Sequence, residues 1–140
     1  MTYAVARYAE RVSTEPELDR SEVRMIELIF PHQTNHYGTL FGGHALGLMD
    51  KAGFLSATRL ARRTMVTVAS DRVEFKVPVR AGQMVELVAR VERVGTTSVT
   101  VGVEMYVEEL LSRERRLATT GSFVFVAVDE DGTPVPIAAE

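Results

Sequence analysis

The hydrophobic pattern changes period once along the chain, and the change separates a helix from a group of strands. From Gly42 to about Arg62, apolar residues recur at intervals of three and four, with no proline and few β-branched residues, which predicts one long helix. Small or apolar residues cover more than one stripe of this helix, so we expect it to be buried on most sides. The basic residues near its end, Arg59, Arg62 and Arg63, complement the helix dipole.

The segments on either side of this helix have the pattern of β-strands. The run Met25–Phe30 precedes the helix and is ended by Pro31, so we expect a first strand followed by a loop. After the helix, apolar and polar residues alternate, which indicates half-buried strands. Four such strands are expected, near residues 72–77, 85–94, 98–108 and 115–128.

The order of strand, long helix and four strands predicts an α+β domain. Since no helices separate the last four strands, we expect them to pair as antiparallel hairpins, with the central helix as the only element able to cover the sheet. The expected fold is one buried helix wrapped by one curved antiparallel sheet. Its open sheet edges and the far flank of the helix would be covered by edge-to-edge pairing across a two-fold axis, which predicts at least a homodimer.

Composition narrows the class of protein. The chain of 140 residues fits one domain, which we place at residues 21–140, after a polar N-terminal arm, residues 1–20, that we expect to be poorly ordered. A net charge of -3 with scattered basic residues argues against nucleic acid as a partner. Cysteine is absent, which excludes disulfides, thiolate ligands and a cysteine nucleophile. Without a signal-like or membrane-spanning apolar run, we expect a cytoplasmic protein that does not insert into membranes.

The start of the helix is the first candidate for chemistry. Gly42 and Gly43 stand where unpaired backbone N–H groups point outward and the dipole is positive, so they could stabilise an oxyanion, or could merely permit a tight turn. Asp50 lies about two turns into a mostly apolar helix, where a carboxylate is costly to bury unless it is paired or functional. The structural alternatives for Asp50 are an exposed acid beside Lys51 and a satisfied core acid.

The loop before the helix holds weaker signals. Asn35 could orient a water or a carbonyl group by hydrogen bonding, or could be an ordinary turn residue. His32, His36 and His44 lie near the same segment, but His32 and His36 are in the loop before the helix, where their spacing places them on no common face, so we predict no metal site. The chain also lacks the G-x-S-x-G elbow of serine hydrolases and the G-x-G-x-x-G phosphate fingerprint.

Taken together, Asn35-x-x-Gly38-x-x-Phe41-Gly42-Gly43 followed by Asp50 resembles the signature of the hotdog-fold acyl-CoA thioesterases of the acyl-CoA hydrolase group. The resemblance extends over most of the chain, from about residue 31 to residue 136. It also includes the segments 66–69, 78–79, 95–98, 125–129 and 132–134. The ordered set is more specific than any one of its parts.

The resemblance implies roles for the candidate residues. Asp50 would act as general base on water or as nucleophile on the thioester carbonyl, and Asn35 would position the water or the carbonyl. The backbone N–H of Gly42, with that of Gly43, would be the oxyanion donor. In this family the site forms across a dimer, with Asn35 of one subunit facing Asp50 of the other, and three dimers often form a hexamer.

The resemblance also implies substrate contacts. Thr96, Thr97 and Ser98 would lie near the coenzyme A arm, and Arg93, Arg90 or Arg113 could contact its phosphates or could be solvated surface charges. The expected function is hydrolysis of acyl-CoA without a metal or organic cofactor. The alternative is a non-catalytic hotdog domain that senses acyl-CoA. Hydration of enoyl thioesters is less favoured because no Asp-His pair is arranged for it.

Overall fold

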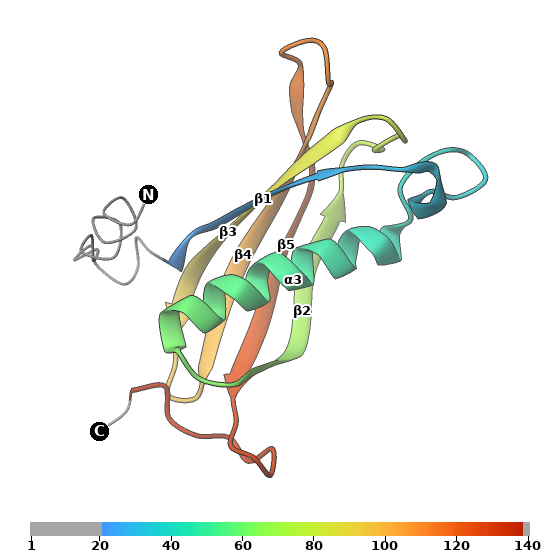
Figure 1. Cartoon of the computed structure of the whole chain (residues 1–140). Coiled ribbons are helices and arrows are strands. Elements are labelled where there is room, and N and C mark those ends of the chain that lie inside the picture. Colours follow the sequence, from blue (N-terminus) through green and yellow to red (C-terminus); the bar gives the residue numbers. More distant parts are fainter. Residues whose placement is uncertain (1–20, 139–140) are drawn as a thin grey trace, which may run out of the picture.

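One long helix crosses one face of a single five-stranded antiparallel sheet (Figure 1). The computed structural model describes residues 21–138, so the expected N-terminal arm, residues 1–20, lies outside the described part. The elements are β1 (Val23–Leu28), the 3-10 helix η1 (Pro31–Gln33), α3 (Gly42–Ala61), β2 (Met65–Phe75), β3 (Met84–Val94), β4 (Ser98–Glu108) and β5 (Arg115–Ala127). The predicted α+β hotdog fold, a long helix wrapped by an antiparallel sheet, is confirmed.

The strand order is β1-β3-β4-β5-β2, and every neighbouring pair is antiparallel. β3, β4 and β5 form the predicted hairpins. The prediction is wrong for β2, which does not pair with β3 but lies beside β5 at the other edge of the sheet. The reason is that β1 occupies the free side of β3, so residues 76–83 carry the chain from the edge strand β2 past β5 and β4 to β3.

β2 is an exposed and irregular edge strand. It begins at Met65, seven residues before the predicted start at residue 72, and almost all of its residues are exposed or half-buried. Its pairing with β5 shifts register twice, and Arg72 has a positive φ of 52°. Because an edge strand that is open on both faces need not alternate, the two-residue period did not reveal its first half.

The core lies between α3 and the sheet. β4 shows the alternation most clearly, since its odd-numbered residues from Val99 to Val107 are buried and its even-numbered residues are half-buried on the opposite face. Helix and sheet approach closely at Gly53, where an added Cβ would lie 3.0 Å from Cζ of Phe125. Glycine at this position therefore allows the close packing that fixes α3 on the sheet.

The helix is buried on one side only, which corrects the expectation of burial on most sides. Its buried residues are Ala45, Leu48, Met49, Ala52, Gly53, Ser56 and Ala57. Gly43, Gly47 and Phe54 remain exposed, because the single sheet covers one face and nothing else within residues 21–138 covers the flank beside β2. That helix is also not long and apolar enough to span a bilayer, and the same holds for any other helix in this range.

Candidate active site

Asp50 lies half-buried on α3 and faces the edge strand β2. The Thr67 hydroxyl donates a hydrogen bond of 2.7 Å to Asp50 Oδ1. Both residues line an open groove of about 380 Å³ between helix and strand, together with Leu46, Gly47, Val68, Ala69, Ser70 and Phe123. Asp50 is therefore neither a solvated acid on a polar strip nor a buried core acid, and its other oxygen, Oδ2, accepts no hydrogen bond from residues 21–138.

Thr67 is the residue that the sequence analysis missed. It contacts Asp50 only because β2 lies beside α3, and it is separated from Asp50 by a helix end and a turn. The register shift between Thr67 and Ala69 also breaks the alternation that could have assigned its side chain to the helix side. A hydroxyl in an otherwise apolar segment, Val66–Ala69, was the one available signal.

Asn35 uses the two ends of its amide differently. Its Oδ1 accepts hydrogen bonds from the backbone N–H of Tyr37 (2.9 Å), and from the N–H and the hydroxyl of Thr39 (both 3.1 Å). Gly38, with a φ of 80°, completes this turn. The side-chain oxygen is thus a turn former, as the structural alternative held, while the Nδ2 donors make no hydrogen bond within the described chain.

The N-terminus of α3 keeps its backbone donors available. Phe41 occupies the N-cap and provides no side-chain hydrogen bond, so the first N–H groups, including those of Gly42 and Gly43, lack a capping side chain. A Cβ added to Gly43 would meet nothing within 4 Å, and one added to Gly42 would lie 3.5 Å from Cζ of Phe75. The backbone here is open to an approaching group at the positive end of the helix dipole.

A single chain holds the candidate acid and the candidate oxyanion donor apart. Gly42 opens into a pocket of about 350 Å³ that it shares with Thr39, Leu40, Ala45, Phe75, Lys76, Val77, Pro78, Val79 and Thr119. Asp50 lines the separate groove with Thr67, and Asn35 lines neither cavity. The three residues that the motif unites in sequence are therefore not gathered into one cavity by one chain.

The predicted substrate-binding residues lie elsewhere. The turn with Thr96, Thr97 and Ser98 joins β3 to β4 and is tied to the C-terminal segment, because Ile137 donates to the Thr96 carbonyl at 2.8 Å. Arg93 is exposed on β3, which two other strands separate from β2. Arg90 forms ion pairs with Glu22 and Glu104, and Arg113 is exposed in the β4–β5 turn. None of these side chains lines the Asp50 groove.

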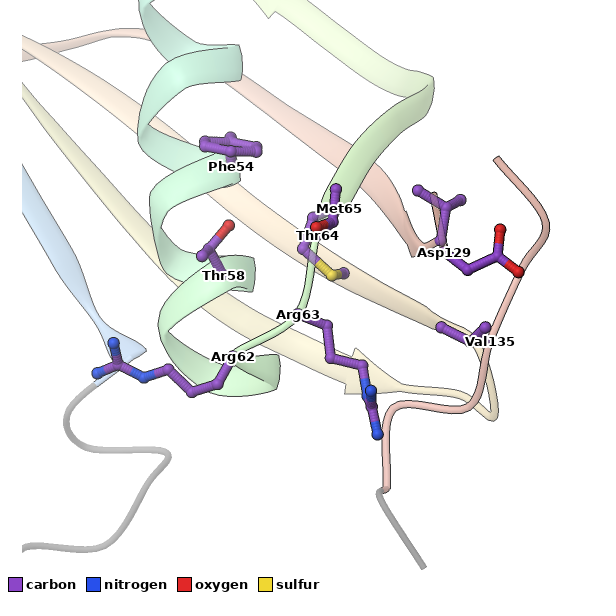
Figure 2. A pocket seen from close by; sticks show the side chains of 9 residues that line it. Phe54, Thr58, Arg62, Arg63, Thr64, Met65, Asp129 and Val135 are labelled. Carbon is purple, nitrogen blue, oxygen red and sulfur yellow. The ribbon is translucent and has the colours of Figure 1, made fainter. Parts of the chain in front are cut away.

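A larger cavity, about 760 Å³, lies at the other end of α3. Figure 2 shows Phe54 and Thr58 on the helix and Arg63 extending toward the C-terminal segment, where its Nε donates to the Ile137 carbonyl at 3.4 Å. Its one carboxylate, that of Asp129, accepts the backbone N–H groups of Asp131 and Thr133. Because the Asp129 carboxylate closes a turn of the C-terminal segment and lies outside the motif that joins Asn35, Gly42 and Asp50, the Asp50 groove is the better candidate for catalysis.

Each of the three histidines contacts a side chain of the segment before α3. His44 Nε2 lies 2.7 Å from Nε2 of Gln33, and His36 contacts the ring of Tyr37. His32 stacks on Phe30. Within residues 21–138 no three histidine or acidic side chains come together in a way that could hold a metal ion.

Sequence comparison links the chain to one enzyme family. The model of the thioesterase superfamily matches residues 37–112, which is more than half of the chain. YkhA of Bacillus subtilis, named an uncharacterized acyl-CoA thioester hydrolase, is 40% identical over 84% of this chain and 68% of its own length. The acyl-CoA thioester hydrolase YciA of Escherichia coli is 33% identical over 92% of this chain and 100% of its own length.

The solved structures of one relative include substitutions at three positions whose spacing can be compared with this chain. The acyl-CoA hydrolase of Staphylococcus aureus, in complex with butyryl coenzyme A and coenzyme A, is 30% identical with a TM-score of 0.80, over 85% of this chain and 73% of that one. It has also been solved with alanine replacing an asparagine, an aspartate or a threonine, at positions that follow one another at intervals of 15 and 17 residues. The same intervals separate Asn35, Asp50 and Thr67.

A hexameric acyl-CoA thioesterase gives a similar match. It is 39% identical with a TM-score of 0.81, over 85% of this chain and 76% of that one. The fold, the family model and the relatives agree with the motif around Asp50. This chain therefore belongs to the thioesterase superfamily, in the group of the acyl-CoA thioester hydrolases.

Proposed function

We propose that this protein hydrolyses acyl-CoA to a free carboxylic acid and coenzyme A, with the Asp50 carboxylate as general base or nucleophile. The observation that carries the proposal is the Asp50 carboxylate, which lies in a groove and is held by Thr67 at 2.7 Å in a chain related to acyl-CoA thioester hydrolases. The interval pattern shared with the Staphylococcus aureus hydrolase supports the choice of Asn35, Asp50 and Thr67.

The groups present suit two routes. As general base, Asp50 takes a proton from a water molecule, the water attacks the thioester carbonyl, and the coenzyme A thiolate leaves. As nucleophile, the carboxylate attacks the carbonyl directly, the thiolate leaves, and water hydrolyses the resulting anhydride. In both routes the uncapped N–H groups of Gly42 and Gly43 stabilise the oxyanion, and the Thr67 hydrogen bond fixes the carboxylate.

The proposed site combines two chains. β2 has an unpaired edge and exposes Val66, Val68 and Phe75, so antiparallel pairing with β2 of a second copy would cover apolar surface and close the edge. Such pairing brings the Phe75 end of one strand, with Gly42 nearby, next to the Thr67 end of the other, where Asp50 lies. Assembly of three dimers into a hexamer is proposed from the hexameric relative.

Further substrate contacts complete the proposal. The Nδ2 donors of Asn35 would position the water or the carbonyl, since its Oδ1 is engaged in the turn. The coenzyme A arm would be contacted by Thr96, Thr97, Ser98 and Arg93. These residues do not line the groove of their own chain, so they would reach a substrate bound at the groove of another copy. A cytoplasmic location also remains a prediction.

A coenzyme A release assay tests the function. The purified protein is given acyl-CoAs from acetyl- to palmitoyl-CoA and benzoyl-CoA, and free thiol is measured over time. Hydrolysis of at least one substrate under multiple-turnover conditions supports the enzyme. Tight binding of acyl-CoA without release from any substrate would instead establish the non-catalytic sensor.

A further inference from the structure

We infer that the pocket at the start of α3 receives the acyl chain of the substrate and selects aliphatic chains of up to about twelve carbons. We call it the Gly42 pocket, and its lining residues are Thr39, Leu40, Gly42, Ala45, Phe75, Lys76, Val77, Pro78, Val79 and Thr119. This inference rests on the proposed function, since it assigns one part of the same substrate.

The Gly42 pocket lies beside the place where the thioester carbonyl is proposed to bind. Gly42 stands on its rim, so a thioester carbonyl that accepts the N–H groups of Gly42 and Gly43 has the pocket directly beside it. The Phe75 ring closes the rim opposite the helix end, 3.5 Å from where a Cβ of Gly42 would lie. The acyl carbons next to the carbonyl therefore have a path into the pocket between α3 and the end of β2.

The pocket is framed by backbone hydrogen bonds. Leu40 donates to the Val79 carbonyl at 2.7 Å, and Lys76 donates to the Ala118 carbonyl at 2.7 Å. These bonds fix the loop before α3 and the segment after β2 against β5. Since its walls are held by the main chain, the cavity is preformed, as expected of a small-molecule site.

The chemistry of the walls favours an uncharged chain. Leu40, Ala45, Phe75, Val77 and Val79 supply apolar surface. Lys76 is the one titratable residue of the lining, and its ammonium is already paired with Glu74 at 3.1 Å. A carboxylate or another anionic group on the acyl chain would find no available cation here, whereas methylene groups would be removed from water.

The size of the pocket sets the length. A volume of about 350 Å³ holds up to about twelve groups of roughly 30 Å³ each. Each buried methylene should raise kcat/KM about fourfold until the pocket is full, because burial contributes about 0.8 kcal/mol per methylene. Longer chains should then gain nothing more.

The test measures kcat/KM from acetyl- to palmitoyl-CoA for the wild type and two variants of the pocket. Phe75→Ala, which removes the ring at the rim of the pocket, should move the optimum to longer chains. Val77→Phe should lower octanoyl-CoA hydrolysis about tenfold or more, while acetyl-CoA hydrolysis changes about threefold at most, because only long chains reach the added ring. Phe54→Ala, in the larger cavity of Figure 2, is the control and should leave the optimum unchanged.

The outcomes separate this inference from the proposed function. An optimum that moves with Phe54→Ala, and not with Phe75→Ala or Val77→Phe, would overturn the assignment and place the chain in the larger cavity. If no acyl-CoA is hydrolysed, the proposed function fails, and the affinities of thioether analogues of butyryl- and octanoyl-CoA for the same variants then decide the pocket. Equal loss of affinity for both analogues in Val77→Phe would also overturn the inference.

Discussion

The hydroxyl of Thr67 and the carboxylate of Asp50 connect the edge strand β2 to α3 through a hydrogen bond of 2.7 Å. This contact orients the acid toward the open flank of the helix, where the groove begins. It engages Oδ1 and leaves Oδ2 for a water molecule or a thioester carbon. The proposed catalytic residue is thus positioned by the strand that the proposed dimer would also use.

Thr67→Val should reduce turnover by about tenfold to a hundredfold, with a small change in KM. The reason is that hydrogen bonds to charged groups contribute about 1.5–3 kcal/mol, and this one holds the carboxylate in its working orientation. Steady-state coenzyme A release measures the effect, and Thr67→Ser should restore most of the activity. Full activity in Thr67→Val would show that the contact has no role in the reaction.

Asn35 variants separate the turn from the active site. Asn35→Asp keeps the oxygen that accepts from Tyr37 and Thr39 but loses the Nδ2 donors, so we expect unchanged thermal stability and about a hundredfold loss of kcat. Asn35→Ala removes both functions and should also lower the free energy of unfolding by about 1–2 kcal/mol. Wild-type turnover in Asn35→Asp would leave Asn35 as a turn former alone.

The buried hydroxyl of Ser56 should make the native state less stable. Ser56 is 0% exposed, and its Oγ has no hydrogen-bond partner in the described part of the chain. Because an unsatisfied buried hydroxyl is unfavourable, Ser56→Ala should raise the free energy of unfolding by about 1 kcal/mol in urea denaturation. Ser122→Ala, on the half-buried outer face of β5, is the control and should change stability by less than about 0.5 kcal/mol. A large loss of stability in Ser56→Ala would contradict this account.

Glu22 should make stability depend on acid pH. The hydrogen bond from Arg90, at 2.5 Å, is the main cause that lowers the pKa of Glu22, and the nearby charges of Arg90 and Arg24 add to it. A lowered pKa in the folded state contributes stability above the pKa of the unfolded chain, and this contribution is lost as pH falls through the folded-state pKa.

Glu22→Gln should therefore be less stable than wild type at neutral pH, by at most about 1 kcal/mol for a partly exposed pair. The difference should shrink as pH falls below about 4. Unfolding curves at several pH values measure it, with Glu27→Gln as the control, because Glu27 has no ion pair among residues 21–138. A difference that is constant with pH would contradict the proposed role of the pair.

Much of the fold could be predicted from local pattern. The helix follows from apolar spacing between Gly42 and Arg62, and β3, β4 and β5 lie close to their expected ranges. The position of β2 could not be predicted in this way. β1 occupies the free side of β3 and β2 pairs with β5, and the periodicity of one segment does not say which distant segment it pairs with.

The candidate site, like the fold, could be predicted only in part from the sequence. Asp50 is conspicuous in the sequence because a carboxylate interrupts an apolar helix, and Gly42 because it begins that helix. Thr67 is not, since its contact with Asp50 exists only after β2 has been laid beside α3. Asn35 has a turn role that the sequence suggested and a free amide nitrogen that only the hydrogen bonds reveal.

The most direct test of the central claim is coenzyme A release by Asp50→Asn, measured with the best substrate of the wild type. Asparagine has nearly the same shape and can still accept the Thr67 hydrogen bond, so folding and substrate binding should be kept. We predict that kcat falls by at least about a hundredfold while KM changes little, because the base or nucleophile is lost. Turnover equal to that of the wild type would contradict the assignment of Asp50.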